Sequence, residues 1–436
     1  MEKELLEMAA RVRLLGVNPD TLVVNVLPMD TTGEIVKRPL VDSLQAELDQ
    51  WKELAQNEDE PVPTRWVFEG SNLFMLDKAG APFKWILEHP KIKVAISRGI
   101  RVPLVGQVRF SSEYLWASRG ALDKAVSNVW VFLCGIFGEL ITLQPAGIDL
   151  ALDFAGWDVG VCNPKDHFIY RAITDDDVPG GFNEDGMIDG PDKIKRRWRR
   201  LTGLPFGRHT SAVSGLLYDK THEIKYHSKE KAWFYDLWPV EKDEDGQPKE
   251  AVWRLELRFK RKALHEFGIE TVWGLLEHLA DLWAYGVGHV GGDTDGLPDG
   301  WLRYVVPVAD MNRSRWPVHP VWQVLQEASL LLEAAEVSNV AKLQRQRKRE
   351  VNMDRAIAAF AGYASTVEAW RQNFACEHPI GKTPDIETDI SDTFSFIYKN
   401  VQAYLQEMEE KKKKKSFAEQ VSKKRVVYHL APGAIE

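Results

Sequence analysis

The chain has 436 residues, 44% of them hydrophobic and 28% charged, so it can bury a sizeable core and is not a disordered protein. Its formal net charge of −8 argues against an evenly basic surface for nucleic acid, although the basic residues are clustered in blocks. Three cysteines are too few and too scattered for a disulfide framework or a four-ligand zinc site. This cysteine usage is typical of a reducing compartment and predicts a cytoplasmic protein.

An N-terminal segment, residues 1–62, predicts a helix, a short strand at 21–28 and a second helix at 40–56. The linker "NEDEPVP" follows it. The most apolar run of the chain, "VWVFLCGIFG" at 129–138, ends before a glutamate. Because a membrane span needs about 20 apolar residues, this run predicts a buried helix, and we expect no membrane partner.

Residues 63–317 alternate between strand-like and helix-like pieces, with few regular strand–helix–strand repeats. This pattern predicts an α+β fold with a mainly antiparallel sheet and helices on one face. Residues 318–410 predict a helical C-terminal region, and residues 411–436 a basic tail. The strand-like pieces are "KVAIS" (93–97), "LVGQVRF" (104–110), "IDLALDF" (148–154), "AVSGLLYDK" (212–220) and "WRLELRFK" (253–260).

Four blocks of basic residues stand out against the acidic average, since local clusters rather than net charge form a phosphate-binding surface. Each block is equally explained as a solvated helix face, above all the lysine run of the tail. The blocks are "KIKRRWRR" (193–200), "RLELRFKRK" (254–262), "KLQRQRKR" (342–349) and "KKKKK" (411–415).

Two nucleotide-binding signatures fail on their context. "IGKTP" lacks the first glycine of a phosphate-binding loop, because Cys376 stands in its place. "GVGHVG" (286–291) matches the dinucleotide fingerprint, but it follows a helix-like stretch and precedes a loop. Neither motif predicts a nucleotide site.

Charged residues alternate with apolar residues in three of the predicted strands. If the strands lie in one sheet with matched faces, the side away from the core carries carboxylates, basic groups and a tyrosine. This combination suits phosphoryl transfer, because carboxylates bind hard cations, cations bind phosphate and a tyrosine hydroxyl can attack phosphorus. A polar face exposed to solvent gives the same pattern. The residues are Asp149, Asp153, Tyr218, Lys220, Arg254, Glu256, Arg258 and Lys260.

Spacing restricts what the two aspartates can do together. Asp149 and Asp153 are four residues apart, which separates their Cα atoms by ~13 Å on a straight strand. Either the strand bends, or one aspartate binds a metal ion while the other positions a neighbour. Asp219 and Glu223 are expected to orient Lys220 or to cap a following helix.

The segments "SGLLYDKTHEI", "IDLALDFAGWD" and "VWRLELRFK" resemble motifs of the replication initiation factor (Rep_trans) family. This family includes initiators of rolling-circle plasmids and relaxases of integrative conjugative elements. The resemblance extends from "VFEGSNLFML" to "NRSRWPVHPVW", more than half of the chain. It implies that residues 63–317 form a DNA-binding domain that nicks and rejoins DNA through a tyrosine and a divalent metal.

By position, the resemblance makes Tyr218 the nucleophile, with Tyr226 and Tyr235 as nearby competitors. It makes Asp149, Asp153 and Glu256 the metal or acid–base residues, with Mg²⁺ or Mn²⁺ as cofactor. Lys220 is expected to lower the pKa of the tyrosine or to neutralise developing charge. Gly147 departs from the family, which often has a basic residue there, and Arg254 or Arg258 would replace that phosphate contact. The expected DNA-binding residues are Arg196, Arg197, Arg199, Arg200, Arg254 and Arg258.

The implied partner is origin DNA, double-stranded with an exposed single strand, and nicking would leave a 5′-phosphotyrosyl bond and a free 3′-hydroxyl. A host helicase and a second copy of the chain are further expected partners. Three alternatives stay open: a relaxase of a mobile element, a non-catalytic DNA-binding regulator, and a metal-dependent nuclease that forms no covalent intermediate.

Overall fold

The computed structural model describes residues 2–100, 102–161, 167–171, 195–197, 200–208, 210–292, 299–310 and 312–332, together with 343, 345, 398 and 399. The chain divides into two compact units, Met1–Arg345 and Gln346–Glu436. All described residues except 398 and 399 belong to the first unit. Apart from residues 398 and 399, the expected helical region beyond residue 345 and the basic tail lie outside the described residues.

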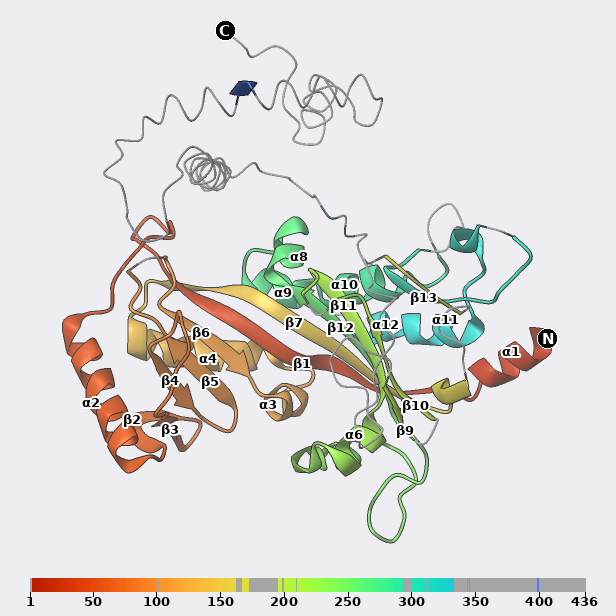
Figure 1. Ribbon diagram of the computed structural model, residues 1–436, viewed down its shortest axis with the longest axis horizontal. Coiled ribbons are helices and arrows are strands. Elements are labelled where there is room, and N and C mark those ends of the chain that lie inside the picture. Colours follow the sequence, from red (N-terminus) through yellow and green to blue (C-terminus); the bar gives the residue numbers. More distant parts are fainter. Residues whose placement is uncertain are drawn as a thin grey trace, which may run out of the picture. The chain divides into compact units, whose positions relative to one another are not determined.

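An 11-stranded sheet in the order β2-β3-β4-β5-β6-β1-β7-β12-β11-β10-β9 forms the body of the first unit (Figure 1). All strand pairs in the described part of the chain are antiparallel, which confirms the predicted α+β class. The strands are Arg13–Pro28 (β1), Val62–Phe68 (β2), Ser71–Met75 (β3), Trp85–Glu88 (β4), Ile92–Ile96 (β5), Gly106–Phe110 (β6), Ile141–Ala155 (β7), Lys195–Arg197 (β9), Arg200–Phe206 (β10), Val213–Asp219 (β11) and Trp253–Lys260 (β12). Strands β8 (Phe168–Tyr170) and β13 (Leu302–Tyr304) form a separate pair.

The helices are Glu2–Ala9 (α1), Asp42–Glu58 (α2), Ser112–Ala117 (α3), Leu122–Phe137 (α4), Lys220–Tyr226 (α6), Phe234–Leu237 (α7), Arg261–Glu266 (α8), Val272–Glu277 (α9), Leu279–Val287 (α10), Pro320–Gln326 (α11) and Ala328–Leu332 (α12). Two of these helices, α2 and α4, have 17 and 16 residues, and the others are shorter. The 3₁₀ helices are Val159–Val161 (η1), Lys229–Lys231 (η2) and Arg313–Arg315 (η3). Over residues 2–332, leaving out the gaps, no helix is long and apolar enough to cross a membrane.

Strand β1 occupies the middle of the sheet and pairs with β6 on one side and β7 on the other. It begins eight residues before the strand that the sequence predicts, because Pro19 does not end it. The pairing with β7 shifts register between Pro19 and Thr21, which leaves Asp20 as the extra residue of a bulge. Proline lacks an amide hydrogen, and within sheets it occurs at bulges and edges for this reason. The first strand of the chain thus joins both halves of the sheet.

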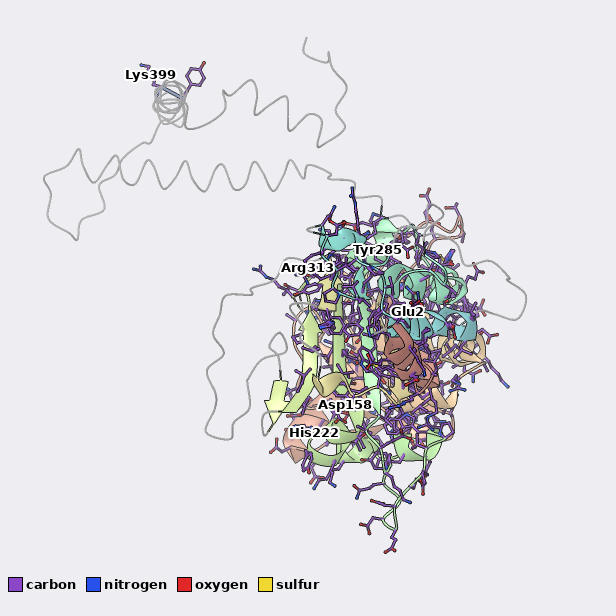
Figure 2. The ribbon with its side chains drawn as sticks, turned by 90° about the vertical axis from the view of Figure 1, so that its right-hand side faces the viewer. Glu2, Asp158, His222, Tyr285, Arg313 and Lys399 are labelled. Carbon is purple, nitrogen blue, oxygen red and sulfur yellow. The ribbon has the colours of Figure 1, made fainter. Side chains whose placement is uncertain are left out.

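The two faces of the sheet have different cover. On one face, apolar residues of the strands pack with α4 and α8–α12 into the large core. The apolar run of α4 is buried only in part, because Val129 and Leu133 face the core whereas Val131 is 63% exposed. On the opposite face, α3, α6 and α7 form a smaller core over β7 and the start of β12. Figure 1 shows α8–α10 on one side of the sheet and α3 and α6 on the other. In Figure 2, His222 of α6 and Tyr285 of α10 likewise lie at opposite sides of the unit.

The chain turns at Gly156, directly after β7, and packs there against the backbone of residues 11 and 12. The φ of Gly156 is +87°, and a Cβ there would lie 1.9 Å from the Arg11 carbonyl oxygen. Gly120 has a similar φ of +81° but no atom within 4 Å of the same position. Both changes to alanine cost the left-handed conformation, about 1–2 kcal/mol, whereas only Gly156→Ala adds a clash with backbone.

We expect Gly156→Ala to lower the free energy of unfolding by about 3 kcal/mol or more, and Gly120→Ala by clearly less. Denaturant unfolding of the two variants measures the difference. Equal losses would contradict the packing of the turn on residues 11–12.

Candidate active site

Tyr218 and Glu256 meet on the face of the sheet opposite the large core. Tyr218 lies near the end of β11, and Glu256 lies in the neighbouring strand β12, where alternation directs both side chains to the same face. The Tyr218 hydroxyl donates a hydrogen bond of 3.3 Å to Oε2 of Glu256. The Tyr218 side chain is half-buried. Its hydroxyl thus contacts a carboxylate in a partly buried part of the protein.

Arg258 connects Glu256 to Asp149 of β7. Its Nη2 lies 2.6 Å from Oε1 of Glu256, and its Nε lies 3.9 Å from Oδ2 of Asp149. The register of β12 on β7 places Arg258 directly opposite Asp149. Arg258 and Asp149 are each about a quarter exposed, so this part of the site is open to solvent.

The pKa of the Asp149 carboxyl group is far above its ordinary value. Burial and the neighbouring charge of Glu256 raise the pKa of Asp149 to about 7, although Arg258 opposes the shift. Like charges held close together disfavour the ionised form. A cation bound between the two carboxylates would relieve this repulsion.

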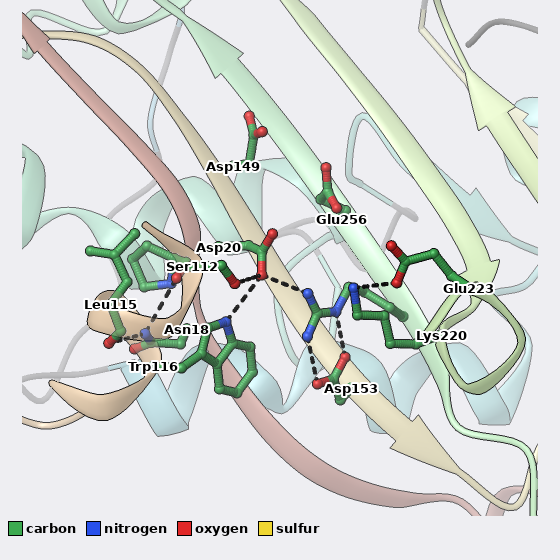
Figure 3. Close-up of polar contacts among 12 residues, drawn as sticks. Asn18, Asp20, Ser112, Leu115, Trp116, Asp149, Asp153, Lys220, Glu223 and Glu256 are labelled. Atoms are coloured by element: carbon green, nitrogen blue, oxygen red, sulfur yellow. Dashed lines mark hydrogen bonds and ion pairs between the residues drawn. The ribbon is translucent and has the colours of Figure 1, made fainter. Parts of the chain in front are cut away.

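Arg254, a predicted DNA contact, is instead buried at the inner end of the site, and its side chain has no exposed surface. It donates two hydrogen bonds to Asp153, from Nε at 2.6 Å and from Nη2 at 2.8 Å, and a third from Nη1 to Asp20 at 2.6 Å (Figure 3). Asp153 also accepts a hydrogen bond, 2.9 Å long, from Trp238, which directly follows α7. Both oxygens of Asp153 are therefore used within the protein. We assign Asp153 and Arg254 a supporting role rather than contact with metal or DNA.

Aromatic residues from two helices enclose the guanidinium. The central carbon of Arg254 lies 4.3 Å from the ring centroid of Phe234 in α7 and 5.2 Å from that of Trp116 in α3. Arginine stacks well on aromatic faces because its charge is delocalised and weakly hydrated. These contacts, and the smaller core around them, explain why alternation alone did not predict the burial of Arg254.

Asp20 is the site residue that the sequence analysis missed. The bulge after Pro19 directs it onto the face of the site, where its Oδ1 accepts hydrogen bonds from Arg254, from Ser112 at 2.7 Å and from Trp116 at 3.2 Å. Burial alone would raise the pKa of Asp20, but Arg254 and Lys220 hold it below its ordinary value. Figure 3 shows its other oxygen directed toward the side where Asp149 and Glu256 lie. Pro19, between the strand-like runs on either side of it, was the available signal for a bulge.

Lys220 differs from its predicted position, because β11 ends at Asp219 and Lys220 begins α6. As expected, Asp219 caps this helix by accepting from His222 N at 2.9 Å, and Glu223 holds the Lys220 ammonium at 2.7 Å. The ammonium is fully buried and lies 5.5 Å from the ring centroid of Tyr218. Burial and the nearby Arg254 lower the pKa of Lys220.

The pKa of Tyr218 shifts in the direction opposite to the one expected. Burial and the Glu256 carboxylate raise it well above its ordinary value, and the cations around it do not compensate. The Lys220 ammonium lies over the ring and is paired with Glu223, so it does not stabilise an ionised hydroxyl. Tyr218 is therefore protonated at neutral pH and needs a base in order to react.

The competing tyrosines lie in other surroundings. Tyr226 is in the last turn of α6, 47% exposed, with its ring centroid 4.7 Å from that of His222. Tyr235 lies in α7 and packs on Trp238, with ring centroids 5.8 Å apart. Of the three tyrosines, Tyr218 is the one that contacts Glu256.

The described residues of the basic block, 195–197 and 200, lie at the edge of the sheet. Arg196 and Arg197 are in β9, and Arg200 begins β10, which pairs with β11. Arg199 lies outside the described residues. Two strand spacings separate the backbone of β9 from that of Tyr218 in β11, about 10 Å.

The carboxylates suit a hard cation in their chemistry. Over residues 2–332, leaving out the gaps, no three histidine, cysteine, aspartate or glutamate side chains are arranged to hold a metal ion. Magnesium is nevertheless commonly bound by one or two carboxylates together with substrate phosphate. Asp149 and the free oxygen of Asp20 provide two such carboxylates on one side of the site.

Comparisons with known proteins add little to this geometry. No family model matches the sequence, and no curated protein matches it. One solved structure to which the chain is similar is that of a rolling circle replication initiator protein from Geobacillus stearothermophilus. The sequence identity is 13% and the TM-score 0.36, with 76% of this chain and 100% of that chain covered. A TM-score this low establishes neither a shared fold nor a shared activity.

The role of Arg254 can be tested by stability. Arg254→Met leaves Asp20 and Asp153 without their buried counter-ion, and removing one partner of such a pair costs about 3–5 kcal/mol. Arg261→Met, at the start of α8, removes a partly exposed ion pair with Glu270 and should cost less than about 1 kcal/mol. Denaturant unfolding of both variants provides the measurement, and a small loss for Arg254→Met would rule out the network as a support of the fold.

The shifted Asp149 carboxyl predicts how stability depends on pH. Its pKa is about 7 in the folded protein and about 3.9 in an unfolded chain. The folded state therefore holds the proton more tightly, and stability should fall as pH rises from about 4 to 7. In EDTA, the melting temperature of the wild type should decrease over this range, and that of Asp149→Asn should decrease less.

Adding Mg²⁺ at pH 8 should raise the melting temperature of the wild type by a few degrees, because the cation replaces the proton as partner of the carboxylate. Asp149→Asn should gain less. Identical responses of the two proteins to pH and to Mg²⁺ would show that Asp149 is neither strongly shifted nor a metal ligand.

Proposed function

We propose that the chain nicks and rejoins one strand of origin DNA through Tyr218, as an initiator of rolling-circle replication. The observation that carries the proposal is the hydrogen bond from the Tyr218 hydroxyl to Glu256 in a site that also holds Arg258 and Asp149. A nucleophile beside a base, with that base held by a third group, is the general arrangement of covalent catalysis. The motifs around Tyr218, Asp149 and Glu256 support the same assignment.

The first step is attack of the tyrosine oxygen on the scissile phosphorus. Glu256 takes the hydroxyl proton through the oxygen that already accepts it, which compensates for the raised pKa of Tyr218. The new bond joins the tyrosine oxygen to phosphorus, and the bond from phosphorus to the 3′ oxygen breaks. The 3′ oxygen leaves, takes a proton from water and becomes a free 3′-hydroxyl, while the 5′ phosphate stays on Tyr218.

Arg258 supplies positive charge beside the reacting phosphate. It is about a quarter exposed and fixed by Glu256, so a phosphate oxygen can approach it without breaking the ion pair. Charge already in place where negative charge accumulates lowers the barrier because little reorganisation is required. Lys220 lies over the Tyr218 ring and, held by Glu223, positions the ring rather than the hydroxyl.

Asp149 would be the main ligand of a Mg²⁺ or Mn²⁺ ion, with Asp20 as the second carboxylate. The ion would supply further positive charge to the phosphate oxygens. Glu256 keeps the role of base because its Oε2 faces the hydroxyl. Rejoining is the reverse reaction, in which a 3′-hydroxyl attacks the phosphotyrosine and the tyrosine regains its proton from Glu256.

The proposed partner is origin DNA with an exposed single strand. A host helicase and a homodimer follow from the family resemblance alone. A relaxase would use the same site chemistry on the DNA of a mobile element, so the site residues do not distinguish these two functions.

Tyr218→Phe tests the nucleophile, because it keeps the ring and its packing and removes only the hydroxyl. We expect normal folding and DNA binding, with loss of nicking and of the covalent adduct. Tyr226→Phe and Tyr235→Phe serve as matched controls and should retain both. The adduct is detected on a denaturing gel, and proteolysis should place the nucleotide on the peptide that contains Tyr218.

The same experiment separates the alternatives. A regulator would cut nothing in any of the four proteins. A nuclease without a covalent intermediate would cut with Tyr218→Phe and leave no adduct. An adduct that maps to Tyr226 or Tyr235 would move the reaction away from Tyr218.

A further inference from the structure

A groove of ≈ 850 Å³ opens beside the active site on the same face of the sheet. It reaches from Asp20 and Thr21 in β1 toward Phe74 in β3. Lys93 of β5 and Arg109 of β6 line its floor, and Lys231 of η2, the 3₁₀ helix after α6, lines it as well. The groove is thus continuous with the site at Asp20, whereas the chemistry proposed for Tyr218 uses none of its basic residues.

The floor of the groove follows one row of cross-strand neighbours. Phe74 pairs with Glu88, Glu88 with Lys93, Lys93 with Arg109, and Arg109 with Val23. Two residues along β1, Thr21 pairs with Asp149 of the site. From Phe74 in β3 to Asp149 in β7 there are five strand spacings, about 24 Å. The row therefore has room for several nucleotides.

The uncompensated charges of the groove are positive. Its two carboxylates are already paired, Glu88 with Lys93 at 3.0 Å and Asp20 with Arg254 at 2.6 Å. Over residues 2–332, leaving out the gaps, the side chains of Arg109 and Lys231 form no hydrogen bond or ion pair. Arg109 is exposed, and both cations lie close enough to the site to affect it, Arg109 acting on Asp149 and Lys231 on Asp20. A protein with a net charge of −8 thus directs two unpaired cations into one groove.

The far end of the groove has an exposed aromatic ring. Phe74 is 40% exposed, although it lies in a strand whose neighbouring residues are packed in the core. A cationic groove with an aromatic platform is the usual surface for a single strand, because phosphates bind the cations and unpaired bases stack on the ring. A base paired in a duplex does not offer its face to such a ring.

We propose that this groove binds the single DNA strand on one side of the scissile phosphate. Arg109 and Lys231 contact successive phosphates, and a base stacks on Phe74 about five strands from the site. This proposal rests on the proposed function insofar as the strand leads to Tyr218. It adds that several nucleotides away from the nick determine affinity, through contacts that involve no catalytic group.

The test uses Tyr218→Phe protein, so that no covalent bond contributes to binding. Binding of a single-stranded oligothymidylate is followed by fluorescence anisotropy over a range of salt concentrations. The double change Arg109→Ala and Lys231→Ala should weaken binding about tenfold or more and lower the salt slope by about 1.4, since each phosphate contact on a single strand contributes about 0.7. Phe74→Ala should weaken binding about 5-fold or more with the slope unchanged.

A matched double control removes two exposed cations that do not line the groove, Arg11→Ala and Lys37→Ala. The control loses two positive charges, as the groove variant does. Its salt slope should stay within about 0.3 of that of the Tyr218→Phe protein, because no phosphate contact is lost. Equal losses in the groove variant and the control would overturn the proposal. An equal effect of the groove variant on a duplex oligonucleotide would overturn the assignment to a single strand.

The outcome is independent of the nicking reaction. If Tyr218→Phe still forms the adduct but the groove variant loses affinity, Tyr218 is not the nucleophile, and the binding of single-stranded DNA in the groove is supported. If Tyr218→Phe abolishes the adduct and the groove variant binds as the control does, Tyr218 is supported as the nucleophile, and the proposal that the groove binds single-stranded DNA is wrong.

Discussion

The buried guanidinium of Arg254 is the interaction on which the rest of the site depends. It joins β12 to Asp153 of β7 and to Asp20 of β1, three neighbouring strands of the sheet. Removing such charges from water costs several kcal/mol per ion, and good geometry has to offset that cost. Here the offset comes from three charge-assisted hydrogen bonds and from the rings of Phe234 and Trp116. Helices α3 and α7, which supply these rings, thereby cover the inner end of the site.

This arrangement divides the charged residues of β7 and β12 on the face of the site into two parts with different properties. The inner part, around Arg254, is buried, and the guanidinium there is held by three hydrogen bonds to Asp153 and Asp20. The outer part, around Asp149 and Arg258, is partly exposed and holds carboxylates close together, which raises the pKa of Asp149 to about 7. Tyr218 lies at the boundary, with its ring against the buried Lys220 and its hydroxyl on Glu256. Rigidity on one side and open coordination on the other are what a group that must attack a bound phosphate requires.

Much of this could be predicted from alternation along the strands. The patterns in β7 and β12 correctly placed Asp149, Asp153, Arg254 and Glu256 on the face away from the large core. They did not predict that α3 and α7 bury Asp153 and Arg254, because burial depends on segments far away in the sequence. Of the two roles considered for the spaced aspartates, the hydrogen bonds between Asp153 and Arg254 favour the positioning role for Asp153.

The remaining differences come from local geometry that periodicity does not describe. Asp20 reaches the site through a bulge, where an extra residue breaks the alternation on which the prediction depends. Lys220 leaves the strand because Asp219 caps a helix immediately after Tyr218. The direction of the Tyr218 pKa shift depends on how deeply the hydroxyl is buried and on which cation is already paired, and neither is visible in one strand.

The bond between Asp20 and Arg254 joins positions 234 residues apart, which has consequences while the chain is being synthesised. A ribosome adds about 5–20 residues per second, so roughly 12 to 47 seconds pass between the appearance of Asp20 and that of its partner. Until Arg254 has been made, β7 has no β12 beside it, and neither Asp20 nor Asp153 has the guanidinium as its partner. Long-range pairing of this kind slows folding, because a large loop must close before any contact is gained. The N-terminal strand at the centre of the sheet is therefore among the last elements to reach its final surroundings in a newly made chain.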